Sequence, residues 1–332
     1  MTWKSLGFRL TAFLCIAFFA LSLHAQQSER SVYRFLQLPS SPRTTALGYG
    51  LSSTLNPDVD MMLQNPALLI ESMHQSWSAS YENRLGGIRR SNLSGAYFLA
   101  PMKATVGVSL AYLDYGTIDR IDPFGNQQGD FRPYEFHLST HYSQDMGHKL
   151  HLGAGLHYIQ ARYAGNFNNA LALNGGLYYR NEEARNSFGL TFGHTGFQVQ
   201  QVSTQAEPLP FEIRATYSQR LQYLPFEWHL GLRHLNQPEL LLPSENSSDV
   251  ALIQQLGRHL VFGGELSIGK ALQVRFSYDP WRNQNLSGGQ DFDFSGTNYG
   301  FGIKLKQFDI NIARSVQGDL GPQWQLGLLG HL

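Results

Sequence analysis

The stretch Tyr134-Glu135-Phe136-His137-Leu138-Ser139-Thr140-His141-Tyr142-Ser143 decides the fold of this 332-residue chain. Its even positions are mostly aromatic or aliphatic, and its odd positions are Glu, His or Ser. Side chains on a β-strand point alternately to opposite faces, so this pattern predicts a strand with one apolar and one polar face. A solvated face is expected to carry more Lys and Glu, so this polar face suits the lumen of a barrel.

The same alternation recurs from about residue 74 to the end of the chain. We count 14 segments, most of 8 to 12 residues, centred near Ser78, Ala96, Leu110, Leu138, Ala154, Asn174, Leu190, Ala215, Leu230, Gly264, Val274, Ile303, Ile310 and Leu326. A tilted strand needs about 9 to 11 residues to cross a bilayer, and single-chain bacterial barrels have an even strand number. The pattern therefore predicts an all-β fold, a 14-stranded antiparallel transmembrane β-barrel over residues 74–332.

The lengths of the connections indicate which end of the barrel faces outward. Long connections include 114–132, 194–209, 236–258 and 280–297, whereas short ones include 100–103, 145–148, 269–270 and 306–307. Outer-membrane barrels have long extracellular loops and short periplasmic turns, so we expect the long set outside the cell. In one of these, residues 240–242 and 250–256 are apolar, which indicates a short helix over the barrel mouth or a docking surface.

Residues 1–25 have the features of a secretory signal. Lys4 and Arg9 are followed by an uncharged run over residues 10–23, and Ala25 precedes the expected cleavage site. The run is shorter than the roughly 20 residues that span a bilayer as a helix, so we favour a cleaved signal over an uncleaved anchor. Cys15, the only cysteine, lies within it, so the mature chain is expected to lack disulfides and thiolate chemistry.

Composition and motifs exclude several classes of function. Lys+Arg and Asp+Glu both number 25 and no basic run appears, which argues against nucleic-acid binding. Charged residues make up 15 %, below the roughly one quarter of a soluble domain. There is no Gly-x-Ser-x-Gly, phosphate loop or paired-carboxylate motif. We therefore expect no enzyme activity, no catalytic residue and no cofactor, and an outer-membrane chain surrounded by lipid.

Histidine is the residue type that most calls for a check on metal binding, since the chain has 12. His137 and His141 are about 13 Å apart if they lie in one strand, too far to share an ion. We interpret the histidines on the predicted polar faces as ordinary lumen residues and expect no metal site. These are His137, His141, His151, His157, His229 and His259.

The segment over residues 26–73 lacks sustained alternation and contains four prolines, Pro39, Pro42, Pro57 and Pro66. Because it precedes the first strand, two positions are open to it: a hatch that plugs the barrel, or a periplasmic arm. As a hatch it would be tied to the wall by Arg43, paired with a lumen carboxylate such as Glu135, Glu212 or Glu265.

Two short elements in this segment resemble a known family. Arg43, Ala46, Leu47 and Gly48 fit Arg-x-x-Ala-Leu-Gly, and Asn65, Pro66 and Ala67 follow after about 17 residues. Both elements are similar to those that precede the first strand in FadL-like outer-membrane barrels. The resemblance implies 14 strands, an N-terminal hatch, and a structural role in that hatch for these residues. Tyr49 departs from the pattern, because a second glycine is common at that position.

The opening Phe35-Leu36-Gln37-Leu38-Pro39 is most similar to the PorQ family of type IX secretion barrels, whose PorV relatives share the other two elements. This resemblance implies an outer-membrane component of the secretion machinery of Bacteroidetes-type bacteria. Its extracellular loops would anchor the cell-surface attachment complex, with PorZ as the most direct partner and PorU and PorV beside it. The wider FadL-like resemblance implies the alternative, a transporter of hydrophobic small molecules.

Overall fold

The computed structural model describes residues 33–163, 165–200, 207–242, 245–246, 250–286, 294–318 and 321–331. The predicted signal over residues 1–25 lies outside them. Within the described ranges, no helix is long and apolar enough to cross a membrane.

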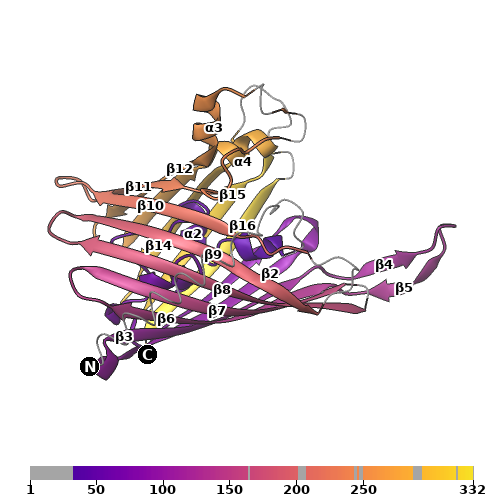
Figure 1. Cartoon of the computed structure of the whole chain (residues 1–332), viewed down its shortest axis with the longest axis horizontal. Helices are drawn as coiled ribbons and strands as arrows, with labels where there is room; N and C mark the ends of the chain where they lie inside the picture. Colours follow the sequence, from indigo (N-terminus) through magenta and orange to yellow (C-terminus); the bar gives the residue numbers. More distant parts are fainter. Residues whose placement is uncertain are drawn as a thin grey trace, which may run out of the picture.

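Fourteen antiparallel strands close into one barrel in the order β1-β16-β15-β14-β13-β12-β11-β10-β9-β8-β7-β6-β3-β2, which confirms the predicted fold (Figure 1). Each strand pairs with its neighbour along the wall, and β1 pairs with both β2 and β16 to complete the circle. The strands are β1 (Ser76–Asn83), β2 (Arg89–Leu99), β3 (Ala104–Asp114), β6 (Tyr134–Asp145), β7 (Leu150–Tyr163), β8 (Asn166–Asn181), β9 (Asn186–Gln200), β10 (Glu212–Arg220), β11 (Phe226–Leu232), β12 (Leu260–Ile268), β13 (Leu272–Tyr278), β14 (Thr297–Lys304), β15 (Phe308–Val316) and β16 (Pro322–His331).

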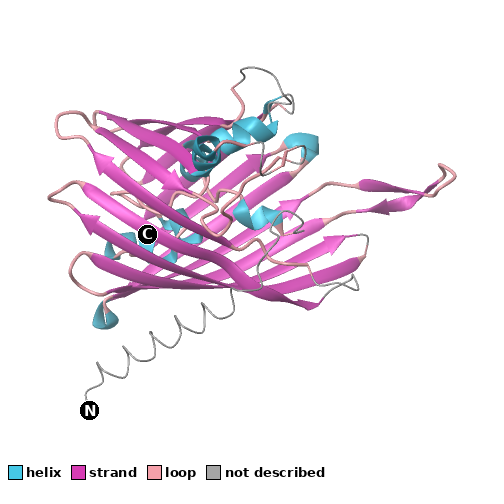
Figure 2. Ribbon diagram, turned by 45° about the horizontal axis from the view of Figure 1, so that its top comes forward, coloured by secondary structure: helices cyan, strands magenta, loops and turns pink. Residues whose placement is uncertain are grey.

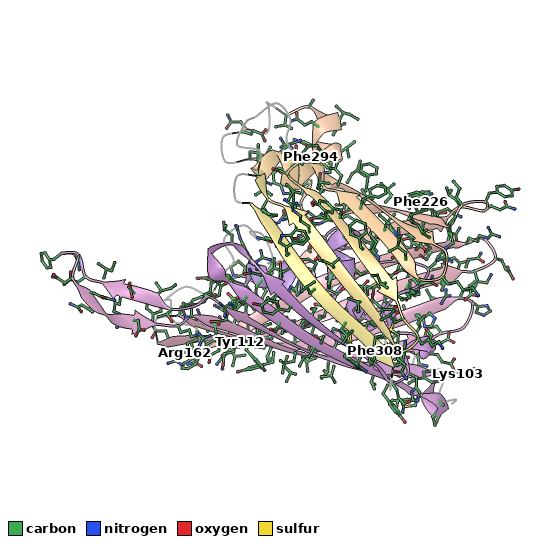
Figure 3. All side chains as sticks on the ribbon, turned by 180° about the vertical axis from the view of Figure 1, so that it is seen from behind. Lys103, Tyr112, Arg162, Phe226, Phe294 and Phe308 are labelled. Carbon is green, nitrogen blue, oxygen red and sulfur yellow. The ribbon has the colours of Figure 1, made fainter. Side chains whose placement is uncertain are left out.

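The two faces of the wall differ as the alternation predicts. On β6 the odd-numbered side chains from Glu135 to Ser143 are buried, whereas Leu138 on the opposite face is 37 % exposed. The exposed face is apolar around the barrel, with Leu93, Phe276 and Leu326 each more than half exposed. Figure 3 shows side chains projecting from the ribbon along its whole length. The polar face is therefore inside and the apolar face outside.

The barrel has a turn end and a loop end. Short connections join β2 to β3, β6 to β7, β8 to β9, β10 to β11, β12 to β13 and β14 to β15 at the turn end. The loop end carries α3 (Leu252–His259), α4 (Pro280–Leu286) and a hairpin of β4 (Ile118–Ile121) and β5 (Gln127–Phe131). This hairpin, absent from the sequence prediction, projects beyond the barrel (Figure 1). Three connections at the loop end are also short: those from β1 to β2 and from β15 to β16 have five residues each, and that from β7 to β8 has two.

The structure places residues 33–73, which we call the hatch, inside the barrel (Figure 2). The hatch consists of one short α-helix and four 3-10 turns: η3 (Arg34–Gln37), α2 (Pro42–Ala46), η4 (Val59–Leu63), η5 (Pro66–Leu68) and η6 (Glu71–Met73). Two further 3-10 turns, η7 (Leu85–Gly87) and η8 (Ala100–Met102), lie between strands.

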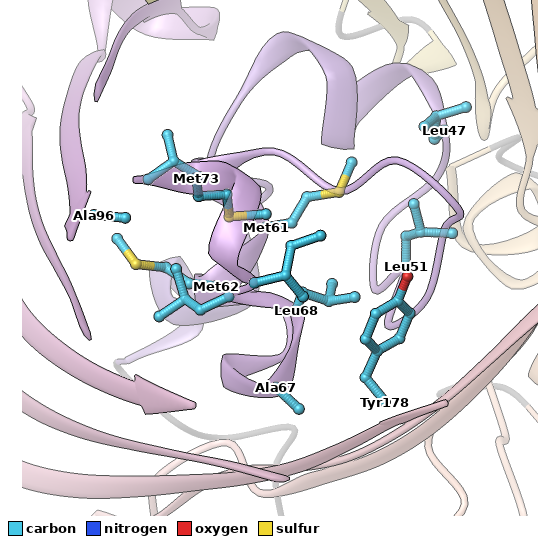
Figure 4. Packing of buried hydrophobic residues seen from close by; sticks show 12 residues of the cluster. Leu47, Leu51, Met61, Met62, Ala67, Leu68, Met73, Ala96 and Tyr178 are labelled. Atoms are coloured by element: carbon cyan, nitrogen blue, oxygen red, sulfur yellow. The ribbon is translucent and has the colours of Figure 1, made fainter. Parts of the chain in front are cut away.

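The hatch has an apolar core of its own within the polar lumen. Met61, Met62, Leu68 and Met73 are at most 3 % exposed and pack together (Figure 4). Burying such side chains stabilises folding by about 1.5–3 kcal/mol each. A second apolar cluster surrounds Tyr33 and includes Leu113 and Leu209, near the loop end. The hatch thus runs from the loop end of the lumen to the start of β1 at the turn end.

Candidate functional site

The first family element folds as a capped helical turn. Ser41 precedes α2 and accepts a hydrogen bond from the Thr44 backbone N–H, while the Thr44 hydroxyl accepts one from the Ser41 N–H. Pro42 occupies the first helical position, where no N–H is needed. Gly48 has φ +98°, a conformation that favours glycine, and its α-carbon faces Val261 of β12 so closely that a Cβ would lie 2.7 Å from a Val261 methyl.

Arg43 on this turn connects the hatch to the wall. Its Nε lies 3.0 Å from Oε2 of Glu265 and its Nη2 lies 3.3 Å from Oε1, a bidentate pair. Nη1 donates to the Asn56 carbonyl oxygen at 2.8 Å and to Asp58 Oδ2 at 3.3 Å. Of the three glutamates expected as partners, Glu265 alone pairs with Arg43 among the described contacts. Burial disfavours the charged guanidinium, but Glu265 and Asp58 outweigh this and hold the pKa of Arg43 above its ordinary value.

The other two glutamates have partners elsewhere in the lumen. Glu135 accepts hydrogen bonds from the hydroxyls of Tyr115 and Tyr163 near the loop end. Glu212 lies 3.4 Å from Arg233 and 3.9 Å from Arg214. Buried carboxylates require such partners. Tyr163 and Arg214 lie in strands, and Tyr115 and Arg233 directly follow strands, so none of these partners comes from the hatch.

The second family element fits against the wall through the Asn65 side chain. Its Oδ1 accepts the Ala67 N–H at 3.0 Å, which caps η5, and its Nδ2 donates to the carbonyl oxygens of Ser52 and Leu177 at 2.8 and 3.1 Å. Wall glycines make room for it: a Cβ on Gly176 would lie 1.9 Å from Asn65 Oδ1, and a Cβ on Gly153 2.2 Å from the Ala67 nitrogen. Glycine inside a strand is a recognised sign of close backbone approach, although its partner cannot be read from the sequence.

Further polar contacts join the hatch to the wall around most of the circumference. The Ser52 and Ser53 hydroxyls contact Thr216 at 2.9 Å and Ser218 at 3.0 Å on β10. Additional contacts include Thr54 with Glu227 on β11, Thr45 with Gln325 on β16, Tyr178 on β8 with the Thr54 carbonyl, and Arg90 on β2 with the Pro39 carbonyl. The hatch is therefore held by matched hydrogen bonds rather than by loose packing.

Asp60 is the one hatch carboxylate whose protonation is strongly perturbed. It accepts hydrogen bonds from Ser78 and, at 3.3 Å, from Asn92. Burial, together with the neighbouring Asp58, raises the pKa of Asp60 to about 7. Desolvation penalises the charged form of a buried acid, so Asp60 gains a proton at mildly acidic pH.

The histidines lie mostly where the alternation placed them. His137, His141, His157 and His229 are buried in the lumen, and His137 Nε2 lies 2.8 Å from His157 Nδ1 on the adjacent strand. His151 is half-buried, and His259 ends α3, where it contacts the Arg233 carbonyl. His194 is also buried, at a bulge in β9 that the sequence did not reveal. The described residues contain no group of three His, Cys, Asp or Glu side chains that could hold a metal ion.

The helices at the loop end form a cap held by one arginine. The fully buried Arg258 of α3 makes a bidentate pair with Glu245 at 2.7 Å, donates to Gln284 of α4 at 2.7 Å, and lies 5.2 Å from the Trp281 ring centre. On α4, the guanidinium of Arg282 lies 3.7 Å from the ring centre of the hatch residue Tyr49. Tyr49, the departure from the family pattern, thus links the hatch to this cap.

The opposite side of α3 presents apolar side chains outward. Leu252, Ile253 and Leu256 are 73 %, 78 % and 54 % exposed, whereas Leu240 and Val250 from the same connection are buried. The connection therefore forms the short helix that was one of its two expected features, and its use as a docking surface stays a prediction. Phe294, 68 % exposed, lies near α3 and α4 (Figure 3). Contiguous exposed apolar side chains commonly mark an interaction surface.

Comparisons with known proteins define the fold. No protein-family model matches the chain, and no curated protein matches it. The CymD monoaromatic hydrocarbon channel is similar at 12 % identity and a TM-score of 0.53, covering 89 % of this chain and 98 % of that one. The Pseudomonas putida toluene transporter TodX is similar at 12 % identity and a TM-score of 0.50, covering 86 % and 95 %. A Pseudomonas aeruginosa FadL homologue matches at 10 % identity and a TM-score of 0.47. CymD and TodX share the barrel fold of this chain.

Proposed function

We propose that the mature chain spans the bacterial outer membrane, with its turn end in the periplasm and its loop end outside the cell. The closed barrel satisfies every strand edge, as a lipid environment requires, and its outward face is apolar from Leu93 on β2 to Leu326 on β16. The long connections β3–β6, β9–β10, β11–β12 and β13–β14 all lie at the loop end, which fits the same orientation. The shared fold of two channel proteins supports this placement.

Within the membrane, the chain serves as an anchor that holds partner proteins at the cell surface. The observation that carries this proposal is the combination of a hatch bound inside the lumen with an exposed apolar surface on α3. The cavity beside the hatch that Tyr49, Thr216 and His229 line holds only about 10 Å³. The hatch is bound through Arg43–Glu265 and many hydrogen bonds, so moving it would break several buried contacts. A static plug suits an anchor.

The partners are the attachment-complex proteins of the type IX secretion system, with PorZ the most direct and PorU and PorV beside it. Support for these identities comes from the resemblance of residues 35–39, 43–48 and 65–67 to that family, and the comparisons name none of these proteins. The exposed side chains of α3 and the β4–β5 hairpin provide the extracellular surface on which PorZ would dock.

A matched pair of variants tests the anchor. Leu252→Glu with Ile253→Glu places two charges on the exposed face of α3, and Met102→Glu with Met146→Glu does the same at the turn end, where both methionines are at least half exposed. Pull-down of the tagged barrel in mild detergent, followed by mass spectrometry, should recover PorZ, PorU and PorV with the wild type and the Met variant but not with the α3 variant. Normal surface attachment of cargo after gene deletion would refute the anchor role.

A second candidate role is a channel for hydrophobic small molecules, and the structural neighbours favour it over the first. CymD and TodX are described as a monoaromatic hydrocarbon channel and a toluene transporter. The apolar cluster around Tyr33, Leu113 and Leu209 near the loop end is buried, so such a molecule would reach it only after part of the hatch had moved. Uptake of radiolabelled toluene and oleate by cells with and without the gene tests this role. Equal uptake by both strains counts against the channel.

A further inference from the structure

The periplasmic mouth of the lumen contains a cavity that neither proposed role uses. It has a volume of about 520 Å³ and lies between the β8–β9 turn, the β10–β11 turn and the hatch residues Leu55 and Asn56. A neighbouring cavity of about 360 Å³ shares Arg180 and Glu182 with it and extends toward Lys149 and His151. Ligand sites commonly measure about 300–1,000 Å³, so each cavity is large enough for part of a ligand.

The larger cavity is basic. Arg180, Arg185 and Arg220 line it, against the single acidic residue Glu182. Arg180 pairs with Glu182 at 2.8 Å while its buried Nε has no hydrogen-bond partner, and Arg220 pairs with Glu227 at 2.8 Å. Arg185 donates to the Gln222 carbonyl oxygen at 2.9 Å and forms no ion pair within the described residues. The guanidinium groups therefore exceed the carboxylates available to them.

The rim of the cavity is apolar and open to the periplasm. Tyr223 and Leu224 of the β10–β11 turn line it and are 89 % and 60 % exposed. In the smaller cavity Lys149 pairs with Glu183 at 3.1 Å, so that part is close to neutral. The combined surface has a cationic centre, an aromatic rim and a neutral extension. An extended ligand with several carboxylates and an apolar side chain would match it.

We propose that this surface binds an acidic peptide segment of a periplasmic protein. Carboxylates of the peptide would pair with Arg180 and Arg185, because guanidinium groups bind carboxylates through two parallel hydrogen bonds. An apolar side chain of the peptide would pack on Tyr223 and Leu224. Such binding lies on the opposite side of the membrane from the α3 surface, so it is independent of the extracellular partners.

The site also contacts the hatch. Arg220 pairs with Glu227, and Oε1 of Glu227 accepts hydrogen bonds from the Thr54 hydroxyl at 2.7 Å and the Leu55 N–H at 2.8 Å. A peptide in the cavity would therefore lie against the hatch loop itself and not only against the turns.

Fluorescence anisotropy on the purified full chain in detergent tests the site. The probe is a fluorescein-labelled heptapeptide of glutamates around one phenylalanine, and the reference peptide carries glutamine in place of each glutamate. Arg180→Gln with Arg185→Gln should weaken binding at least about tenfold, the equivalent of one charge-assisted hydrogen bond. Arg120→Gln, an exposed arginine on the β4–β5 hairpin, should leave binding unchanged.

Several results would overturn the proposal. These are equal binding by the Arg180/Arg185 variant, equal binding of the glutamine peptide, and displacement of the peptide by inorganic phosphate or by phosphatidylglycerol nanodiscs at lower concentration. If the arginine variant does not fold, Tyr223→Ser in the exposed turn replaces it. That variant should weaken binding of the phenylalanine-containing peptide but not of a peptide with alanine at that position. An unchanged affinity of the variant for the phenylalanine peptide would count against the proposal.

Discussion

Replacing Arg43 with alanine should release the hatch without opening the barrel wall. The change removes both hydrogen bonds to Glu265 and those to Asn56 and Asp58. Glu265 keeps Arg275, whose Nε lies 2.6 Å away, but Asp58 loses a buried cationic partner. Breaking a buried ion pair costs about 3–5 kcal/mol. Because Glu265 remains paired, we expect the free energy that holds the hatch in place to fall by about 3 kcal/mol, at the lower end of that range.

A loss of this size multiplies the population of the released hatch by about 150. Hydrogen exchange followed by mass spectrometry should show it as faster exchange of the amides in residues 41–69, with exchange in the strands unchanged. Arg43→Lys should recover part of the protection, because it keeps the charge but loses the bidentate geometry. Wild-type exchange rates in Arg43→Ala would refute the argument that this ion pair holds the hatch.

Three further changes test other parts of the structure. Gly176→Ala would place a Cβ 1.9 Å from Asn65 Oδ1, so it should lower the free energy of unfolding in urea by about 1–3 kcal/mol. A Cβ on the neighbouring Gly175 meets open space, so Gly175→Ala should change that free energy little. Equal effects of the two variants would refute the close fit. Because folding raises the pKa of Asp60 to about 7, its ionisation opposes folding, and stability should fall as pH rises from about 4 to 7. Asp60→Asn should flatten that part of the pH profile, and an unchanged slope would contradict the assignment. Leu138→Lys on the outward face should lower the free energy of unfolding in lipid vesicles by about 2–4 kcal/mol. An unchanged free energy of unfolding would contradict the contact of Leu138 with lipid.

The sequence alone was sufficient to predict the barrel, because its signal is local. Alternation in β6 depends only on neighbouring residues such as Phe136 and His137, and the same holds for each of the other strands. Counting these segments gives the number of strands, and the same count assigns each connection to one end of the barrel. The β4–β5 hairpin was missed because residues 118–121 and 127–131 lack apolar alternation and pair outside the wall.

The contacts of the hatch could not be predicted to the same depth, because they depend on how the barrel closes. The sequence identified Arg43 and three glutamates, but the choice of Glu265 depends on strand stagger and on the tyrosines and arginines that occupy Glu135 and Glu212. Likewise, the Asn65 side chain binds the wall by donating to the Leu177 carbonyl oxygen, which lies more than 100 residues away in the sequence. The available signal was the glycines on the lumen faces of the strands. They indicate that another segment approaches the wall closely, but they do not identify which segment it is.

The central claim is that the hatch fills the lumen of the barrel in the cell, and disulfide trapping tests it most directly. The Ser53 and Ser218 hydroxyl oxygens lie 3.0 Å apart across the hatch–wall boundary, and the only native cysteine lies in the predicted signal. Ser53→Cys with Ser218→Cys should therefore cross-link in intact cells and change the mobility of the unfolded chain on gels. Ser53→Cys with Ser109→Cys, whose wall hydroxyl contacts Ser94 and Asn92 instead, should not. Equal cross-linking of both pairs, or none at Ser53 and Ser218, would contradict a hatch fixed inside the barrel.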